Sequence, residues 1–304
     1  MSFALLFSGQ GAQHPDMLPW LADDALVADT RARLGIDDWR QALADPDWAA
    51  RNEHAQVLLT GLALAAWRQL APRLGAAPAA IAGYSVGELA AFSAAGAWSP
   101  EAALALASCR AAAMDACATL APGGLLAVTG LPAARLDALR ARTGLALAIR
   151  NGVDAVVLGG PLAALAQAQD LATHDGAQCR RLPVGVASHT PWMREAALRF
   201  ATLLEEVPFQ APRVPLFSNA ADRVRDAASA RRALATQIAT TVRWDECMDN
   251  IRDRQIRCVL EVGPGQGLAR MWNQRHPDVP ARACDEFRSA AAIAAWLRGH
   301  AGDD

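Results

Sequence analysis

The segment Ala79–Ala95, AAIAGYSVGELAAFSAA, holds the pattern that decides the fold. A run of small apolar residues ends at Gly83, a tight turn carries Ser85, and a helix-like run begins at Glu88. Gly-Tyr-Ser-Val-Gly matches the G-x-S-x-G turn, in which a strand delivers a serine to the start of a helix. Strand, sharp turn and helix in this order predict an α/β protein.

The rest of the chain repeats this alternation of strands and helices. Phe3–Phe7 is a compact apolar run that predicts a buried strand, and Ala55–Leu70 is apolar on nearly all sides, as in a buried helix. Helices are also expected at 191–206 and 228–240, and strands at 214–219 and 257–263. Such alternation favours a mainly parallel sheet covered by helices.

Residues 125–187 differ from the chain around them. Pro-Gly-Gly at 122–124 interrupts the helical pattern, and the following segments read as βαββαβ, the ferredoxin-like arrangement. We therefore expect a main α/β domain formed by 1–124 and 188–304, with an inserted ferredoxin-like subdomain at 125–187. The final AGDD is expected to be a solvated tail.

Composition excludes several classes of protein. With 304 residues, 53% of them hydrophobic and 20% charged, the bulk of the chain is not disordered. The 29 basic and 31 acidic residues give a net charge of -2 without a basic stripe, which argues against a nucleic-acid partner. All 29 basic residues are arginine, so no mechanism can use a catalytic lysine.

Cysteine spacing and hydropathy exclude further features. The six cysteines form no C-x-x-C pair and lie at no ligand spacing from a histidine, so we expect no metal site and no disulfide framework. The N-terminus lacks a basic segment, and no later apolar run approaches the roughly 18 residues of a membrane span. We expect a cytoplasmic protein with no membrane partner.

Ser85 is the candidate nucleophile, with an ordinary strand-to-helix turn as the alternative. A helix start exposes N–H groups that can stabilise an oxyanion, but a serine hydroxyl also needs a base. Of the six histidines, His189 ends the strand-like run LPVGVASH and precedes a helix. Because no acidic residue lies on an obvious loop between the two, a carbonyl could orient the imidazole.

Arg110 interrupts an apolar face of the helix expected from Pro100 to Cys117. At helical spacing it shares that face with small and apolar side chains (Ala103, Leu106, Ala113 and Cys117). A buried guanidinium needs an anion. The anion is either a structural aspartate or glutamate or the free carboxylate of a substrate.

Six segments together resemble one family, the malonyl-coenzyme A:acyl carrier protein transacylases, over nearly the whole chain. They occur in the family's order: GQGAQ at 9–13, GYSVGE at 83–88, RAAAM at 110–114, Ser-His at 188–189, QIATTVRW at 237–244 and EVGPG at 261–265. The resemblance implies that Ser85 accepts the acyl group, that His189 is its general base, and that Arg110 binds the malonyl carboxylate.

The resemblance also implies that 1–124 and 188–304 form an α/β-hydrolase-like catalytic domain, and it implies the groups around these three residues. The main-chain N–H groups of Gln10 and Val86 would form the oxyanion hole, and the main-chain carbonyl of Gln237 would orient the histidine. No cofactor is expected to stay bound. A coenzyme A thioester, malonyl-CoA, would be the donor, and the prosthetic thiol of an acyl carrier protein would be the acceptor.

Two positions depart from the family pattern: Tyr84 stands where histidine is usual, and Ser8 where proline is usual. Together with SHTPWM at 188–193, they make the chain most similar to the epsilon subunit of malonate decarboxylase, which charges that enzyme's own carrier subunit. We expect this role, with the transacylase of fatty-acid or polyketide synthesis as the alternative. A serine (thio)esterase and a non-catalytic carrier-binding subunit are alternatives of other classes.

Overall fold

The computed structural model describes residues 2–302 and confirms the predicted α/β fold with a mainly parallel sheet. The first sheet has six strands in the order β11-β10-β1-β2-β7-β8, and only β8 runs antiparallel to its neighbour. The strands are β1 (Phe3–Phe7), β2 (Ala80–Gly83), β7 (Leu216–Phe217), β8 (Arg223–Val224), β10 (Cys258–Val262) and β11 (Ala281–Ala283).

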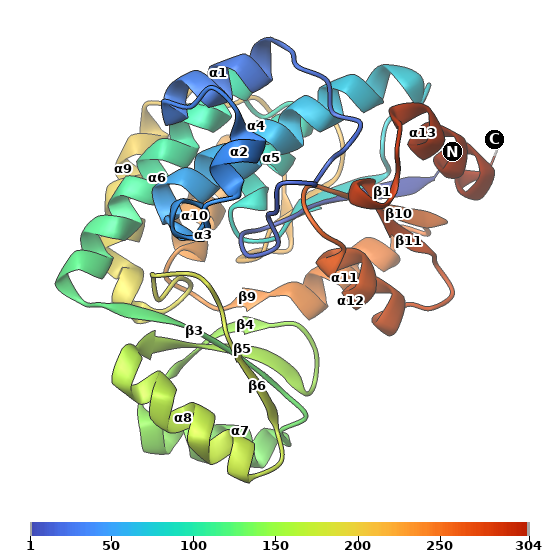
Figure 1. The fold of residues 1–304 in the computed structure, drawn as a ribbon. Coiled ribbons are helices and arrows are strands. Elements are labelled where there is room, and N and C mark those ends of the chain that lie inside the picture. The colour runs from blue at the N-terminus through green and yellow to red at the C-terminus, as the bar shows by residue number, and fades with distance from the viewer. Residues whose placement is uncertain (1, 303–304) are drawn as a thin grey trace.

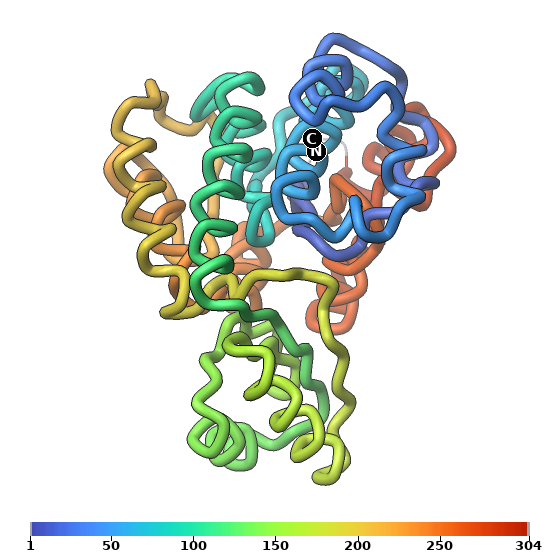
Figure 2. The backbone as a smooth tube through the Cα atoms, turned by 60° about the vertical axis from the view of Figure 1, so that its left-hand side comes forward, coloured from blue at the N-terminus to red at the C-terminus, as the bar shows by residue number. Residues whose placement is uncertain are grey.

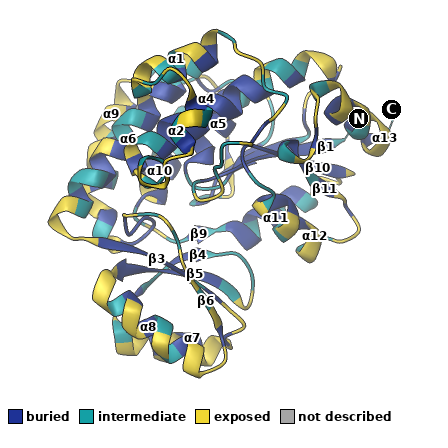
Figure 3. Cartoon of the chain, in the orientation of Figure 1, coloured by how far each residue is buried: buried dark blue, intermediate teal, exposed yellow. Residues whose placement is uncertain are grey.

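Helices cover both faces of this sheet, which explains why β1 is apolar at every position. Phe3, Leu5 and Phe7 pack into one cluster, and Ala4 and Leu6 into another; β1 is drawn as buried in Figure 3. The first cluster is shared with α1 (Ala25–Leu34), α4 (Asn52–Leu70), α5 (Gly87–Ala94), α6 (Pro100–Leu120), α9 (Arg194–Glu205), α10 (Ala227–Gln237) and α13 (Ala290–Ala301). The second is shared with α11 (Trp244–Arg252) and α12 (Gly267–Arg275).

The second sheet forms a separate lobe below the first (Figure 1, Figure 2). Its order is β6-β3-β5-β4-β9, in which β3 to β6 pair antiparallel and β9 is parallel to β4. The elements are β3 (Gly123–Thr129), α7 (Ala133–Thr143), β4 (Ala146–Arg150), β5 (Ala155–Pro161), α8 (Leu162–His174), β6 (Gln178–Arg181) and β9 (Val242–Arg243). The βαββαβ order is confirmed, whereas the boundaries at 125 and 187 stay a prediction.

The two faces of the second sheet have different partners. One face packs on α7 and α8, in a cluster with Leu126 and Leu158. The other face contributes Leu125, Ile149 and Val157 to the cluster that also contains α11, α12 and residues of the first sheet. The lobe is therefore joined to the rest of the molecule by a shared apolar core.

Helix α6 is longer and more apolar than we expected, because the sequence predicted no apolar run of the length of a membrane span. Among residues 2–302 it is the one helix long and apolar enough to cross a membrane, judged by length and composition only. Half of its most apolar stretch is buried, and it packs against α4 and α9. It is a core helix of the domain, and it carries the buried Arg110.

Several short elements have no counterpart in the sequence prediction. Helices α1, α2 (Trp39–Leu43) and α3 (Pro46–Ala50) each begin at an aspartate whose side chain accepts main-chain N–H groups. The predicted solvated tail is wrong at Ala301, which is 2% exposed at the end of α13. Residues 303–304 lie outside the described residues.

Candidate active site

Three loops meet at one edge of the first sheet. Phe7 pairs in register with Gly83 of β2 and Val262 of β10, at the carboxyl ends of three adjacent parallel strands. The residues that follow these strands therefore lie side by side, where open α/β sheets bind ligands. They line a cavity of about 340 Å³ together with Arg110 and His189.

Ser85 occupies the turn after β2 in a strained conformation. Its φ of 56° lies in the left-handed region, which residues other than glycine rarely adopt. A Cβ at Gly83 would lie 2.2 Å from main-chain atoms of Gly87, and a Cβ at Gly87 would lie 2.3 Å from the carbonyl oxygen of Phe7. The two glycines are therefore needed for the turn to pack against β1 and to place Ser85 in the cavity.

His189 lies next to Ser85 and is 1% exposed. Its Nε2 is 2.7 Å from Ser85 Oγ, and its Nδ1 is 2.6 Å from the main-chain oxygen of Gln237, the last residue of α10. Because a carbonyl can only accept, Nδ1 carries the proton and Nε2 is free to accept the serine proton. A carbonyl thus holds the imidazole where a triad acid would otherwise stand.

The surroundings of His189 favour its neutral form. Burial lowers the pKa of the imidazole to about 3, the Arg110 cation lowers the pKa as well, and the Gln237 carbonyl opposes both. The imidazole is therefore neutral around pH 7. A neutral imidazole with a free Nε2 can act as a proton acceptor.

Arg110 is buried on α6, as its place on an apolar helix face predicts, and it lines the same cavity. Its Nη1 donates to Gln56 Oε1 at 2.7 Å, and its Nη2 donates to Gln237 Oε1 at 2.9 Å. Among the residues that the structure describes, no carboxylate pairs directly with it. Burial lowers the pKa of Arg110 to about 10, so the side chain stays cationic.

Gln10 and Val86, whose main-chain N–H groups are expected to form an oxyanion hole, also line the cavity. Val86 directly precedes α5, and Gln10 follows β1 in the neighbouring loop. Within residues 2–302, neither N–H donates to another group of the protein. The buried Nε2 of the Gln10 side chain also has no partner in that part of the chain. These donors are available to a ligand oxygen.

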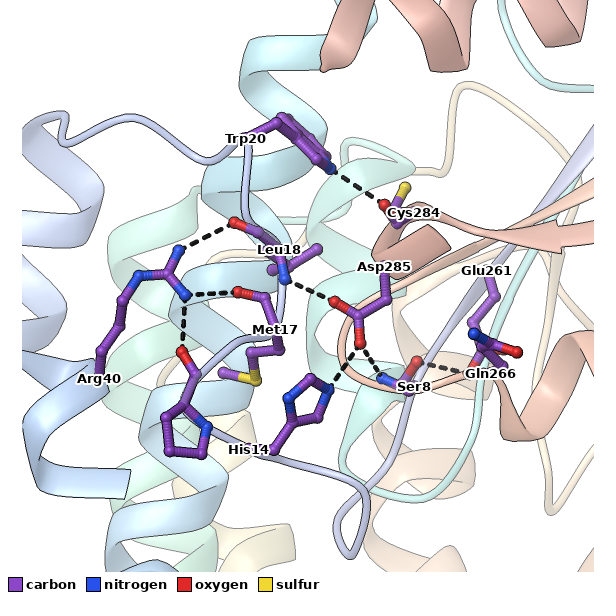
Figure 4. Close-up of polar contacts among 12 residues, drawn as sticks. Ser8, His14, Met17, Leu18, Trp20, Arg40, Glu261, Gln266, Cys284 and Asp285 are labelled. Atoms are coloured by element: carbon purple, nitrogen blue, oxygen red, sulfur yellow. Dashed lines mark hydrogen bonds and ion pairs between the residues drawn. The ribbon is translucent and has the colours of Figure 1, made fainter. Parts of the chain in front are cut away.

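The loop that carries Gln10 is tied to β10 and, through Asp285, to the loop after β10 (Figure 4). Ser8, one of the two positions expected to depart from the family pattern, donates its hydroxyl to Glu261 Oε1 at 2.8 Å. Asp285 accepts from Gly265 N at 2.8 Å, and its carboxylate lies 2.8 Å from His14 Nε2. The Ser8 departure therefore adds a contact that steadies the loop.

Tyr84, the other departure, spans the two sheets. Its hydroxyl donates to Oδ1 of Asn151 at 3.1 Å, and its ring meets Trp244 edge-on with centroids 5.2 Å apart. Asn151 directly follows β4 in the second lobe. Tyr84 and Asn151 both line the cavity.

Sequence reasoning missed Glu88 and Asn219, which help to hold this site together. Glu88 is 0% exposed and accepts from Asn219 N and from the Gln237 amide. Asn219 accepts from Ser85 N at 2.8 Å and donates to the Gly83 carbonyl oxygen at 2.7 Å. Glu88 belongs to the GYSVGE motif, and a charged residue in an apolar helix was a signal of burial with a partner. Asn219 gave no such signal.

No cluster suited to a metal ion accompanies this site. Over residues 2–302, no group of three or more histidine, cysteine, aspartate or glutamate side chains could hold one. The reactive groups at the cavity include a serine, a neutral imidazole and a cation.

Comparisons with known proteins agree with this arrangement. The family described as "Acyl transferase domain" matches residues 4–302. The malonyl CoA-acyl carrier protein transacylase of Mycobacterium tuberculosis (strain ATCC 25618 / H37Rv) is 34% identical over 296 residues, which cover 92% of this chain and 95% of that protein.

Solved structures give the same result. The malonyl CoA-acyl carrier protein transacylase from Coxiella burnetii has a TM-score of 0.89 at 27% identity, covering 99% of this chain and 98% of that chain. A malonyl-transacylase described in complex with its type II polyketide synthase acyl-carrier protein has a TM-score of 0.90 at 26% identity, covering 98% and 100%. The chain therefore belongs to the acyl transferase family that contains the malonyl-CoA:acyl carrier protein transacylases, and it is an acyltransferase.

Proposed function

We propose that this protein transfers a malonyl group from malonyl-CoA to the prosthetic thiol of an acyl carrier protein. The observation that carries the proposal is the 2.7 Å contact between Ser85 Oγ and His189 Nε2, at a cavity that is also lined by a cation without a carboxylate partner. Relatives named malonyl CoA-acyl carrier protein transacylase support the choice of donor and acceptor.

The first half-reaction makes an acyl-enzyme. His189 Nε2 takes the hydroxyl proton as Ser85 Oγ attacks the thioester carbonyl carbon, and the carbonyl electron pair moves onto the oxygen. The N–H groups of Gln10 and Val86 stabilise that oxyanion. Collapse of the intermediate breaks the carbon–sulfur bond, and the coenzyme A thiolate leaves with the proton from His189.

The second half-reaction reverses these steps with another thiol. The prosthetic thiol of the carrier gives its proton to His189 and attacks the ester carbonyl of malonyl-Ser85. The serine oxygen leaves and regains the proton from the imidazolium. The order is ping-pong, because coenzyme A departs before the carrier reacts.

Arg110 would select the malonyl group. The guanidinium is 2% exposed and is held by two neutral amide oxygens, so its charge is left to be paired by a ligand. A malonyl carboxylate can accept from it, whereas an acetyl group would leave the cation buried and unpaired. Discrimination between the two donors follows from this difference.

We also propose which kind of carrier protein accepts the malonyl group and which pathway it serves. The similar structure of a malonyl-transacylase with its acyl-carrier protein supports such a carrier as the partner. The relatives favour a transacylase of fatty-acid or polyketide synthesis over the malonate decarboxylase epsilon subunit, which the sequence led us to expect first. Tyr84 and Ser8 keep the decarboxylase carrier as the second candidate. We propose the cytoplasm as the location, where the six cysteines would keep the free thiols they have here.

A transfer assay tests the activity and separates the alternatives. The protein is incubated with malonyl-CoA and holo acyl carrier protein, and malonyl-carrier is expected only when all three are present. A thioesterase would instead release free malonate without a carrier, and a non-catalytic subunit would release no coenzyme A. Replacing the carrier by the malonate decarboxylase carrier subunit tests the branch, and we expect slower transfer to it.

A further inference from the structure

Arg110 is held by side-chain amides on both sides, and each amide must present its oxygen. An amide can face a guanidinium with oxygen or with nitrogen, and only oxygen accepts a hydrogen bond from it. Gln56 and Gln237 both present Oε1, at 2.7 and 2.9 Å. Something must fix the orientation of each amide.

Glu88 fixes the Gln237 amide. The Nε2 of Gln237 donates to Glu88 Oε2 at 2.6 Å and to the main-chain oxygen of Ser85 at 3.0 Å. Both of these partners are acceptors, so nitrogen faces Glu88 and oxygen faces Arg110. The main-chain oxygen of the same glutamine receives His189 Nδ1–H. One residue thus contacts the cation, the imidazole and the serine turn.

Glu88 also holds the serine turn from the other side. Its second oxygen, Oε1, accepts from Asn219 N. The Asn219 side chain accepts from Ser85 N and donates to the Gly83 carbonyl oxygen. Glu88 must therefore supply two acceptor oxygens to two N–H donors while it is fully buried. Only a carboxylate offers two good acceptors at this position.

We propose that Glu88 is a positioning residue that couples carboxylate recognition by Arg110 to the geometry of Ser85 and His189. This inference rests on the proposed malonyl transfer and adds to it a residue that touches no substrate atom. A neutral glutamine at position 88 would present one acceptor oxygen to two donors. Either the Gln237 amide or the Asn219 N–H would then lose its partner, and the site would shift.

A second chain of amides provides the matched comparison. Gln56 Nε2 donates to Asn52 Oδ1 at 2.7 Å, and Asn52 Nδ2 donates to Asp115 Oδ1 at 2.9 Å. Asp115 thus lies at the far end of the other support of Arg110. This chain does not reach Ser85 or His189. Asn at position 115 can still accept with its one side-chain oxygen, so Asp115→Asn should change little.

Steady-state kinetics with malonyl-CoA and acetyl-CoA test the proposal. For Glu88→Gln we expect kcat/KM with malonyl-CoA to fall about 10- to 100-fold, with kcat lowered and KM raised, and the malonyl-to-acetyl preference reduced. For Asp115→Asn we expect kcat to be unchanged and KM to change by about threefold or less. A Glu88→Gln enzyme with the wild-type preference and kcat would overturn the proposal.

A spectroscopic readout separates positioning from loss of stability. The proton on His189 Nδ1 should give a distinct signal in isotope-edited NMR because of its 2.6 Å contact with Gln237. We expect that signal to move in Glu88→Gln and to stay in Asp115→Asn. An unmoved signal in folded Glu88→Gln would contradict the proposal. The readout needs no activity, so it stands even if the wild type fails to form malonyl-carrier, which would overturn the proposed function alone.

Glu88→Asp keeps the test valid if the glutamine variant folds poorly. Aspartate retains the charge and both acceptor oxygens on a side chain shorter by one methylene. We expect a smaller loss of malonyl preference and a smaller NMR shift than with glutamine or alanine. Equal losses in Glu88→Asp and Glu88→Ala would show that the side chain acts through packing alone.

Discussion

The two lobes contribute different things to the same cavity. The lobe of the first sheet supplies Ser85, His189 and Arg110, together with the buried polar network behind them. The lobe of the second sheet supplies mostly apolar surface, as with Leu125 and Val157. The reactive and charged side chains and the apolar wall of the cavity therefore come from different parts of the chain.

This difference shows where rigidity is needed. Ser85 lies on a turn held by close glycine contacts, and the buried carboxylate of Glu88 supports that turn, so its geometry is fixed before a substrate arrives. The apolar wall has only to exclude water and to accommodate the acyl group of the proposed donor. Substitutions in the first lobe should therefore affect catalysis much more than substitutions in the second.

The largest effect should come from Ser85→Ala. Removing the nucleophile is expected to lower kcat for malonyl transfer by about 10⁴-fold or more, because no covalent intermediate can form. Thermal unfolding should change little, since the serine side chain is small and lies at the cavity. Turnover near the wild-type rate in this variant would show that Ser85 is not the nucleophile.

Arg110→Ala should rank second. It is expected to lower kcat/KM for malonyl-CoA by about 100- to 1,000-fold and to reduce the preference for malonyl over acetyl. Competition between the two donors for one carrier measures this preference directly.

Arg180→Ala is the control for that prediction. Arg180 lines the same cavity from β6 of the second lobe but is exposed, so solvent screens its charge. We expect the malonyl-to-acetyl preference to stay within about twofold of wild type. If Arg180→Ala reduced the malonyl-to-acetyl preference more than Arg110→Ala, the carboxylate would be recognised by the second lobe and not by the first.

The pH dependence should follow Glu88 more than His189. Burial raises the pKa of Glu88 to about 7 from its ordinary 4.5, against the hydrogen bonds and the Arg110 cation, which lower it. The Cys247 thiol of α11 also faces Glu88, and its raised pKa keeps it neutral. The ionised form of Glu88 is present above pH 7 and lost below it, whereas the imidazole stays neutral down to about pH 3.

We therefore expect kcat/KM for malonyl-CoA to decrease as the pH falls through about 7, by about tenfold per pH unit. Glu88→Gln should lack this acidic limb, with lower activity than the wild type above pH 7, where Glu88 is ionised. A limb of the same shape in both enzymes would assign it to another group.

Tyr84→Phe should give the smallest effect. It removes one hydrogen bond between the lobes, the contact with Asn151, and leaves the ring packed on Trp244. We expect about a fivefold rise in KM, which corresponds to about 1 kcal/mol. Ile149→Val, a change in the apolar wall of the second lobe, serves as the comparison. Equal rises in KM for the two variants would argue against a specific role for the Tyr84–Asn151 hydrogen bond.

Much of the fold was predictable because its signals are local. The G-x-S-x-G turn, the apolar run at Phe3–Phe7 and the βαββαβ order each depend on residues close together in the sequence. Strand β9 was not predictable, because it has only two residues and is defined by its pairing with β4, which is distant in the sequence. The short helices α2 and α3 were missed because their caps are common surface residues.

The candidate site was also predictable only in part. The place of Arg110 on an apolar helix face indicated burial, and the structure shows a buried guanidinium at the cavity. The support from Gln56 and Asn219 was not predictable, because amide side chains occur everywhere and only tertiary packing brings these two to the site. The pairing of Ser85 with His189 spans 104 residues; the place of His189 at the end of a strand-like run made it the candidate base, and the resemblance to a family supported the pairing.

The most direct test of acyl transfer through Ser85 is intact-protein mass spectrometry after brief incubation with malonyl-CoA and no carrier. We predict that the wild type gains the mass of one malonyl group, that Ser85→Ala gains none, and that added holo carrier removes the modification. A wild-type protein that stays unmodified, or a Ser85→Ala protein that is modified to the same extent, would contradict the account.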